Sequence, residues 1–162
     1  MGSGRTMKCP KCEYTFYEST GVGFMFPRVY AETVQQAKNG ELGEEIQNFF
    51  NEHEDGAIRA DSVTLCCDKC GALRTGKDLT MFVPKGNKPD QTENGRWSVA
   101  MPFEGARYVS DTELELYYSE YMKYPHKCDE CGGSMHIVGY GEELKCPKCK
   151  VKLETEDFIC WD

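Results

Sequence analysis

Residues 128–149 read CDECGGSMHIVGYGEELKCPKC and contain two Cys-x-x-Cys pairs, Cys128/Cys131 and Cys146/Cys149, with 14 residues between them. Two residues between thiolates allow both sulfur atoms to reach one ion at about 2.3 Å without backbone strain. Each such pair forms a tight turn, here called a knuckle. Gly132 follows the first of these pairs, where the chain often needs a positive φ. The spacing is typical of a four-thiolate zinc site in which a β-hairpin joins two knuckles.

The same pair occurs twice more, so that eight of the ten cysteines lie in four knuckles. A secreted disulfide protein scatters its cysteines and carries an apolar signal segment, and neither feature is found here. We therefore expect a reducing cytoplasmic location, no membrane insertion and two zinc ions. Along the chain, the first, second, third and fourth knuckles are Cys9/Cys12, Cys67/Cys70, Cys128/Cys131 and Cys146/Cys149, and these eight residues are the predicted metal ligands.

The sequence is compatible with two ways of pairing the four knuckles into two metal sites. Sequential pairing joins the first knuckle to the second and the third to the fourth. Crossed pairing joins the first to the fourth and the second to the third. The cost of closing a loop grows only slowly with its length, so energy alone does not exclude the crossed arrangement. The 14-residue separation of the last two knuckles favours sequential pairing.

Between Cys12 and Cys67 lie 54 residues with helical periodicity, which predict a helical hairpin inserted in the first ribbon. Pro27 suits a first helical turn, and Asn39-Gly40 suits a helix end. Apolar residues spaced for one helix face then recur from position 42 to position 53. They are Leu42, Ile46, Phe49, Phe50 and the partly apolar His53.

The remaining chain predicts strands and one connecting helix. Strands are expected around Val63 and Leu65, at 79–83 and, after a loop at 84–96, at 97–103. Ser110 and Glu113 form a capping box for a helix with a tyrosine-rich apolar stripe that continues to Pro125. A helical stripe of this kind is more often core than an interaction surface. Cys66 and Cys160 fall outside the ligand pattern and are expected to be free thiols.

These elements predict a small α+β fold. It would comprise two four-cysteine zinc ribbons with antiparallel β-hairpins, a helical-hairpin insertion in the first ribbon and a connecting helix. The expected domains are 7–124 and 125–162. Residues 1–6, MGSGRT, have the composition of an added leader, and Met7 is the expected natural start.

The knuckle sequences CPKC, CDKCG, CDECGG and CPKC resemble those of the zinc-ribbon, rubredoxin-like superfamily. The resemblance covers the knuckles and their hairpins, about a third of the chain. It does not extend to the helical segments. Its ribbons serve transcription factors, polymerase subunits, ribosomal proteins and enzymes as structural modules, so fold does not determine function. Rubredoxins hold iron and transfer electrons. Here Glu13 and Lys150 stand where rubredoxin loops carry glycine.

The charge balance and the missing catalytic motifs indicate a binding protein. Net charge is −8, and each filled site would add a net −2, so polyanions are poor default partners. The three histidines lack the spacing of a hydrolytic zinc site, and no phosphate-binding loop is present. We expect a non-enzymatic adaptor that binds a protein partner. The alternatives are a nucleic-acid-binding ribbon, using lysines near the last knuckle, and rubredoxin-like electron transfer. The lysines are Lys127, Lys145, Lys148, Lys150 and Lys152.

Overall fold

The structure is a computed structural model that describes residues 2–23, 26–86 and 108–161. The chain forms two compact units. The sheet unit comprises Met1–Gly23, Asp61–Asp78 and Pro125–Asp162, and the helical unit comprises Phe24–Ala60 and Leu79–Tyr124. The expected domains were 7–124 and 125–162. The sheet unit takes residues from both sides of Pro125, because strands distant in sequence pair with one another.

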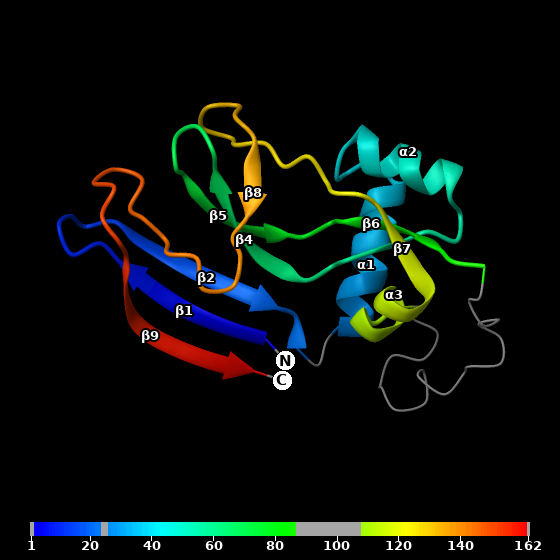
Figure 1. The fold of residues 1–162 in the computed structure, drawn as a ribbon, viewed down its shortest axis with the longest axis horizontal. Coiled ribbons are helices and arrows are strands. Elements are labelled where there is room, and N and C mark those ends of the chain that lie inside the picture. The colour runs from blue at the N-terminus through cyan, green and yellow to red at the C-terminus, as the bar shows by residue number, and fades with distance from the viewer. Residues whose placement is uncertain (1, 24–25, 87–107, 162) are drawn as a thin grey trace. The chain divides into compact units, whose positions relative to one another are not determined.

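The sheet unit contains an antiparallel six-stranded sheet with the order β5-β4-β2-β1-β9, in which β8 also pairs with β4 (Figure 1). N- and C-terminal strands therefore lie side by side. The strands are β1 (Gly2–Lys8), β2 (Thr15–Gly21), β4 (Ser62–Cys67), β5 (Leu73–Lys77), β8 (Met135–Ile137) and β9 (Glu154–Trp161). The strand expected around Val63 and Leu65 is β4.

Residues 2–6, expected to be a leader outside the fold, form most of β1, which pairs with β2 on one side and β9 on the other. The rings of Trp161 and Tyr17 occupy the space that a side chain at Gly2 or Gly4 would need. Arg5 forms an ion pair with the carboxylate of Glu18, which is buried. Residues 2–6 are therefore part of the six-stranded sheet.

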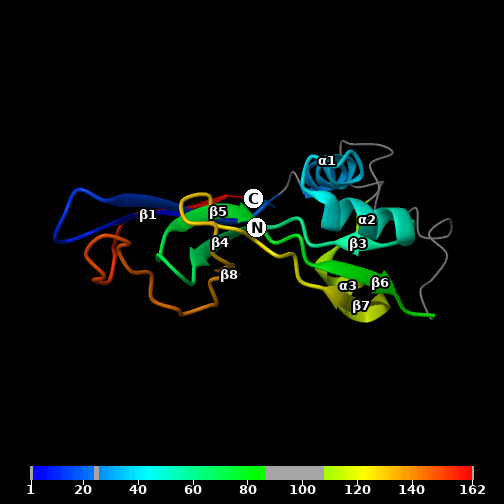
Figure 2. The same ribbon diagram turned by 90° about the horizontal axis from the view of Figure 1, so that it is seen from above.

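The helical unit places α1 (Phe26–Lys38) and α2 (Glu44–Glu52) on one face of a three-stranded sheet (Figure 2). The sheet consists of β3 (Ala57–Ile58), β6 (Met81–Pro84) and β7 (Tyr118–Met122), in that order. Both helices match the hairpin expected from the sequence. They bury one face each, because their apolar residues recur at helical spacing. The buried helix residues are Pro27, Tyr30, Thr33, Ala37, Ile46, Phe49 and Phe50.

The connecting helix is shorter than expected. Its capping box between Ser110 and Glu113 is present, but α3 (Asp111–Tyr117) ends where β7 begins. The later residues of the expected helix form strand β7 instead, because they pair with β6. Aromatic residues such as tyrosine are also favourable in strands. Only part of the tyrosine stripe is core, since Tyr118 is 4% exposed and Tyr121 is 48% exposed.

The strand expected at 97–103 lies outside the described residues, as does most of the loop expected at 84–96. Strand β5 was not anticipated, because its sequence LRTGK lacks apolar alternation. Within the described part of the chain, no helix has both the length and the apolar character needed to cross a membrane.

Candidate metal centres

The eight predicted ligands gather in two groups of four, and the ligand atoms of each group all lie within 4.8 Å of one another. The outer cluster contains the first and fourth knuckles, Cys9/Cys12 and Cys146/Cys149. The inner cluster contains the second and third, Cys67/Cys70 and Cys128/Cys131. This is the crossed pairing. The sequential pairing that the 14-residue spacing favoured was wrong.

Strand register explains the crossed pairing. Strand β1 leads into the first knuckle and β9 follows the fourth, and the register Lys8↔Glu154 brings these two knuckles together. Likewise β4 ends at Cys67, which lies opposite Met135 of β8, just after the third knuckle. The segment between the last two knuckles contains β8, which pairs with β4. Each four-cysteine cluster is therefore positioned by strands that the sequence places far apart.

The sulfur positions suit a tetrahedral ion. In the inner cluster, Sγ of Cys67 lies 3.5 Å from Sγ of Cys131, and Sγ of Cys70 lies 3.7 Å from Sγ of Cys128. In the outer cluster, Sγ of Cys12 and Sγ of Cys146 are 3.7 Å apart although 134 positions separate them in sequence. Four thiolates at about 2.3 Å from a tetrahedral ion would be about 3.8 Å apart. The residues present therefore fit a four-thiolate metal site.

Each knuckle buries its first cysteine and leaves the second half-buried. In three knuckles backbone N–H groups donate to the first sulfur, and in the second and fourth knuckles they lower its pKa. The N–H groups of Lys69 and Cys70 donate to Sγ of Cys67, at 3.4 and 3.5 Å, and their bonds, that of Cys70 foremost, lower the pKa of Cys67 to about 6. Burial opposes ionisation of Cys146, but the N–H groups of Cys149 and Lys148 lower its pKa to about 7. Both turns favour the thiolate form of their first cysteine, whereas the neighbouring sulfurs and burial raise the pKa of the second cysteine, Cys70 or Cys149, to about 12.

The cysteines of both clusters are also packed against apolar side chains. One cluster of buried side chains surrounds the outer cysteines and another surrounds the inner ones. The first includes Met7, Phe16, Leu144 and Leu153, and the second includes Leu65, Ala72 and Met135. Such packing keeps water from the metal site and leaves the ligands with little freedom to move.

A residue with positive φ follows three of the four knuckles, and after the fourth this residue is Lys150 in place of glycine. Gly71 and Gly132 follow the second and third knuckles with φ of 78° and 68°. Lys150 follows the fourth with φ of 59°, a left-handed conformation that costs a non-glycine residue energy. Its ammonium group donates a hydrogen bond of 2.8 Å to the carbonyl of Cys70. The fourth knuckle of the outer cluster is thus tied to the second knuckle of the inner one.

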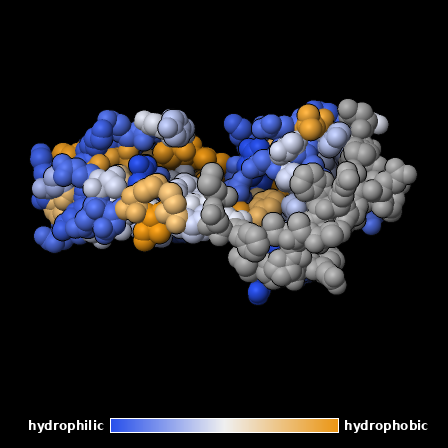
Figure 3. All heavy atoms as spheres, turned by 90° about the horizontal axis from the view of Figure 1, so that it is seen from below, coloured by the Kyte–Doolittle hydropathy of each residue, from blue (hydrophilic) through white to orange (hydrophobic). Residues whose placement is uncertain are grey.

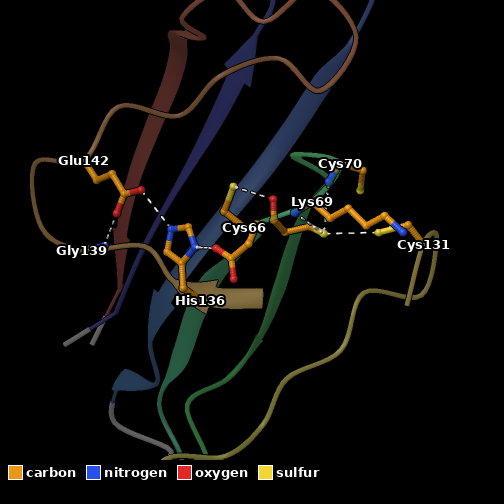
Figure 4. A network of polar contacts seen from close by, with 9 residues as sticks. Cys66, Lys69, Cys70, Cys131, His136, Gly139 and Glu142 are labelled. Carbon is orange, nitrogen blue, oxygen red and sulfur yellow. Dashed lines mark hydrogen bonds and ion pairs between the residues drawn. The ribbon is translucent and has the colours of Figure 1, made fainter. Parts of the chain in front are cut away.

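A histidine between the third and fourth knuckles contacts two carboxylates (Figure 4). Nδ1 of His136 lies 2.6 Å from the carboxylate of Asp68, which follows Cys67, and Nε2 lies 3.1 Å from the carboxylate of Glu142. Glu142 also accepts a hydrogen bond from the N–H of Gly139. Hydrogen bonds to Glu142 and then Asp68 raise the pKa of His136. The histidine spacing indicated no hydrolytic site, and nothing in it showed that the crossed fold would bring Asp68 to His136.

The other candidates lie apart from the clusters. Nε2–H of His126 donates to the carbonyl of Asp78, and burial lowers the pKa of this imidazole. Among the described residues, neither cluster includes a histidine or a carboxylate. Cys66 is half-buried, where burial raises the pKa of its thiol, and Cys160 is exposed. As expected, neither belongs to a four-cysteine group.

Comparisons with known proteins found no match of this chain to a protein-family model, a curated protein or a solved structure.

Proposed function

We propose that this chain is a non-enzymatic zinc protein whose two metal ions stabilise the fold and whose surface binds a partner protein. The observation that carries the proposal is the composition of the two clusters. Each offers four cysteine sulfurs at tetrahedral spacing, so a bound ion has no open position for water or substrate. Hydrolytic zinc sites instead keep one position open and usually include histidine or carboxylate ligands.

Elemental analysis tests the metal assignment. Protein purified in air should contain close to two zinc ions per chain, because two complete sets of four thiolates are present. A red, iron-containing protein would favour rubredoxin-like electron transfer instead. The left-handed Lys150 and the charged Glu13 both depart from the glycines of that family.

The surroundings of the fourth knuckle weigh against nucleic acid as the partner. Lys152 forms an ion pair of 2.5 Å with Glu143, and Lys150 donates to the carbonyl of Cys70. Two of the five lysines in this part of the chain are therefore engaged within the protein, and the net charge is −8. Phosphate contacts weaken steeply as salt rises.

A capture experiment and a salt titration together test the choice of partner. Immobilised protein should retain the same partner protein from independent lysates, with retention little changed by moderate salt. Immobilised protein that captures no partner reproducibly, but binds DNA or RNA with an affinity that falls steeply with salt, would support the rival reading.

A further inference from the structure

Strand β9 forms an open edge of the six-stranded sheet. It pairs with β1, and among the described residues no strand pairs with its other side. Seven of its eight residues are exposed, and Trp161 is half-buried. An edge strand presents a row of N–H and C=O groups to any strand that approaches, so proteins usually protect it. The outer side of β9 is therefore available for main-chain pairing.

The side chains of β9 divide into two chemically different halves. The register of β9 against β1 shifts between Thr6 and Met7, which leaves Glu156 as an extra residue. Before and at this bulge the strand is acidic, with Glu154, Glu156 and Asp157. Beyond it, Phe158 and Ile159 are 64% and 57% exposed and point to opposite faces of the sheet. Figure 3 shows apolar surface exposed on the sheet unit, beside hydrophilic surface.

We propose that the outer edge of β9 binds an extended segment of a partner protein, which adds to the sheet as a further strand. Basic residues of that segment would lie against Glu154, Glu156 and Asp157, and apolar residues would lie against Phe158–Trp161. Main-chain hydrogen bonds supply affinity in this mode of binding, and the side chains on each face supply specificity. The proposal rests on the function proposed above and names the surface and the chemistry of the partner.

Charge complementarity favours a basic segment. The carboxylate of Glu156 lies 3.9 Å from the ammonium group of Lys8, and both side chains are about half exposed, so this ion pair is weak. Glu154 and Asp157 add two more negative charges on the same strand. Opposite charges on facing strands are stabilising, whereas like charges directly opposite each other are destabilising.

A second copy of β9 suits this edge poorly. In a symmetric antiparallel pair, the acidic half of each strand would lie against the apolar half of the other. Carboxylates would then face Phe158 and Ile159 instead of cations. In a parallel pair, the acidic residues of both copies would lie side by side. Neither arrangement satisfies both halves of the strand.

Fluorescence anisotropy with synthetic peptides tests the proposal. The probe is a labelled peptide of about ten residues. Its N-terminal half alternates valine with threonine, and its C-terminal half alternates lysine with threonine, to match β9 in the antiparallel direction. A second peptide replaces lysine by glutamate. We expect saturable binding of the lysine peptide to the zinc-loaded protein and at least about tenfold weaker binding of the glutamate peptide, since each lost charge pair adds to the other.

Two variants of β9 and two matched controls sharpen the test. Ile159→Lys should weaken binding of the lysine peptide about tenfold. Leu116→Lys should leave it unchanged, because Leu116 is equally exposed at 55% but lies on α3. Glu156→Lys should weaken binding of the lysine peptide and strengthen binding of the glutamate peptide, whereas Glu115→Lys, with the same charge change on α3, should do neither. Zinc content and circular dichroism confirm that each variant is folded.

Several results would overturn the proposal. They are absence of saturable binding by either peptide, equal binding by all variants, and sedimentation of the protein alone as a dimer that Ile159→Lys dissociates. The last result would make a second copy the occupant. If the wild type captures a partner protein and Ile159→Lys captures it equally well, the β9 site is wrong while the function proposed above stands. If neither captures a partner but the lysine peptide still binds at β9, the proposed function fails instead.

Discussion

Lys150 shows at the scale of one residue how a strained backbone is held by a distant contact. Its left-handed φ of 59° is strained for lysine or alanine, which carry a Cβ atom, whereas glycine adopts it freely. We expect Lys150→Gly to be more stable than Lys150→Ala by about 1–2 kcal/mol, because both lose the bond to the carbonyl of Cys70 and only glycine relieves the strain. Denaturant unfolding of the zinc-loaded variants measures the difference. Equal stability would show that the turn is not strained.

His136 gives the protein a pH dependence of known sign. Hydrogen bonds to Glu142 and Asp68 raise its pKa above the ordinary value of 6.5. Its contribution to stability is complete below pH 6.5 and is lost as the pH rises through the raised value in the folded protein. Hydrogen bonds from the N–H of Gly139 and then from His136 lower the pKa of Glu142 below 4.5. The contribution of Glu142 to stability is therefore complete above pH 4.5 and is lost as the pH falls through the lowered pKa.

The ion pair between His136 and Glu142 should therefore stabilise the fold most between the lowered pKa of Glu142 and the raised pKa of His136. Because the groups are substantially exposed, the effect should not exceed about 1 kcal/mol. Unfolding of the zinc-loaded wild type and of His136→Gln, followed across this range, should diverge inside the window and converge above it. Parallel curves at every pH would contradict the prediction.

At the scale of elements, β1 leaves little room for a side chain at Gly4. A Cβ atom there would meet the hydroxyl of Tyr17 and the ring of Trp161. We expect Gly4→Ala to destabilise the protein by about 1–3 kcal/mol, since two aromatic side chains on neighbouring strands must move. Gly86→Ala is the control, because nothing lies within 4 Å of the Cβ it would add. Thermal unfolding of both variants measures the cost, and equal midpoints would contradict the place given to β1.

The elements also show where sequence periodicity succeeds and where it fails. The faces of α1 and α2 were predictable because most of the residues they bury recur at helical spacing. The stretch Tyr118–Met122 was not, since an apolar stripe at helical spacing also continues across the junction between α3 and β7. Pairing with β6 decided the conformation of that stretch, and periodicity alone carries no information about a partner strand.

At the scale of the whole molecule, the crossed pairing predicts the metal content of double variants. Cys12→Ser with Cys149→Ser removes two ligands of one cluster, so one zinc ion should be lost. Cys12→Ser with Cys70→Ser removes one ligand from each cluster, so both ions should be lost or weakly held. Sequential pairing predicts the reverse for these two variants. Elemental analysis after dialysis against a weak chelator distinguishes the two arrangements.

Metal removal should affect the two units differently. The sheet unit has small apolar clusters that include the cysteines themselves, whereas the helical unit has one larger core without them. Structural zinc contributes about 10–16 kcal/mol to folding in small zinc-binding peptides. A strong chelator should therefore abolish amide protection in the sheet unit and leave α1, α2 and β6 protected. Uniform loss of protection along the chain would show that the two units fold as one.

The sequence by itself determined which cysteines are candidate ligands, because the two-residue spacing of a knuckle is a local requirement of metal geometry. It also determined the two helices of the hairpin, whose apolar faces are local patterns. Only the tertiary structure decided which knuckles share a cluster and that residues 2–6 belong to the sheet. The reason is the same for both. Strand pairing between β1 and β9, and between β4 and β8, joins residues far apart in the chain, and the slow growth of loop-closure cost with length leaves such pairings open in the sequence.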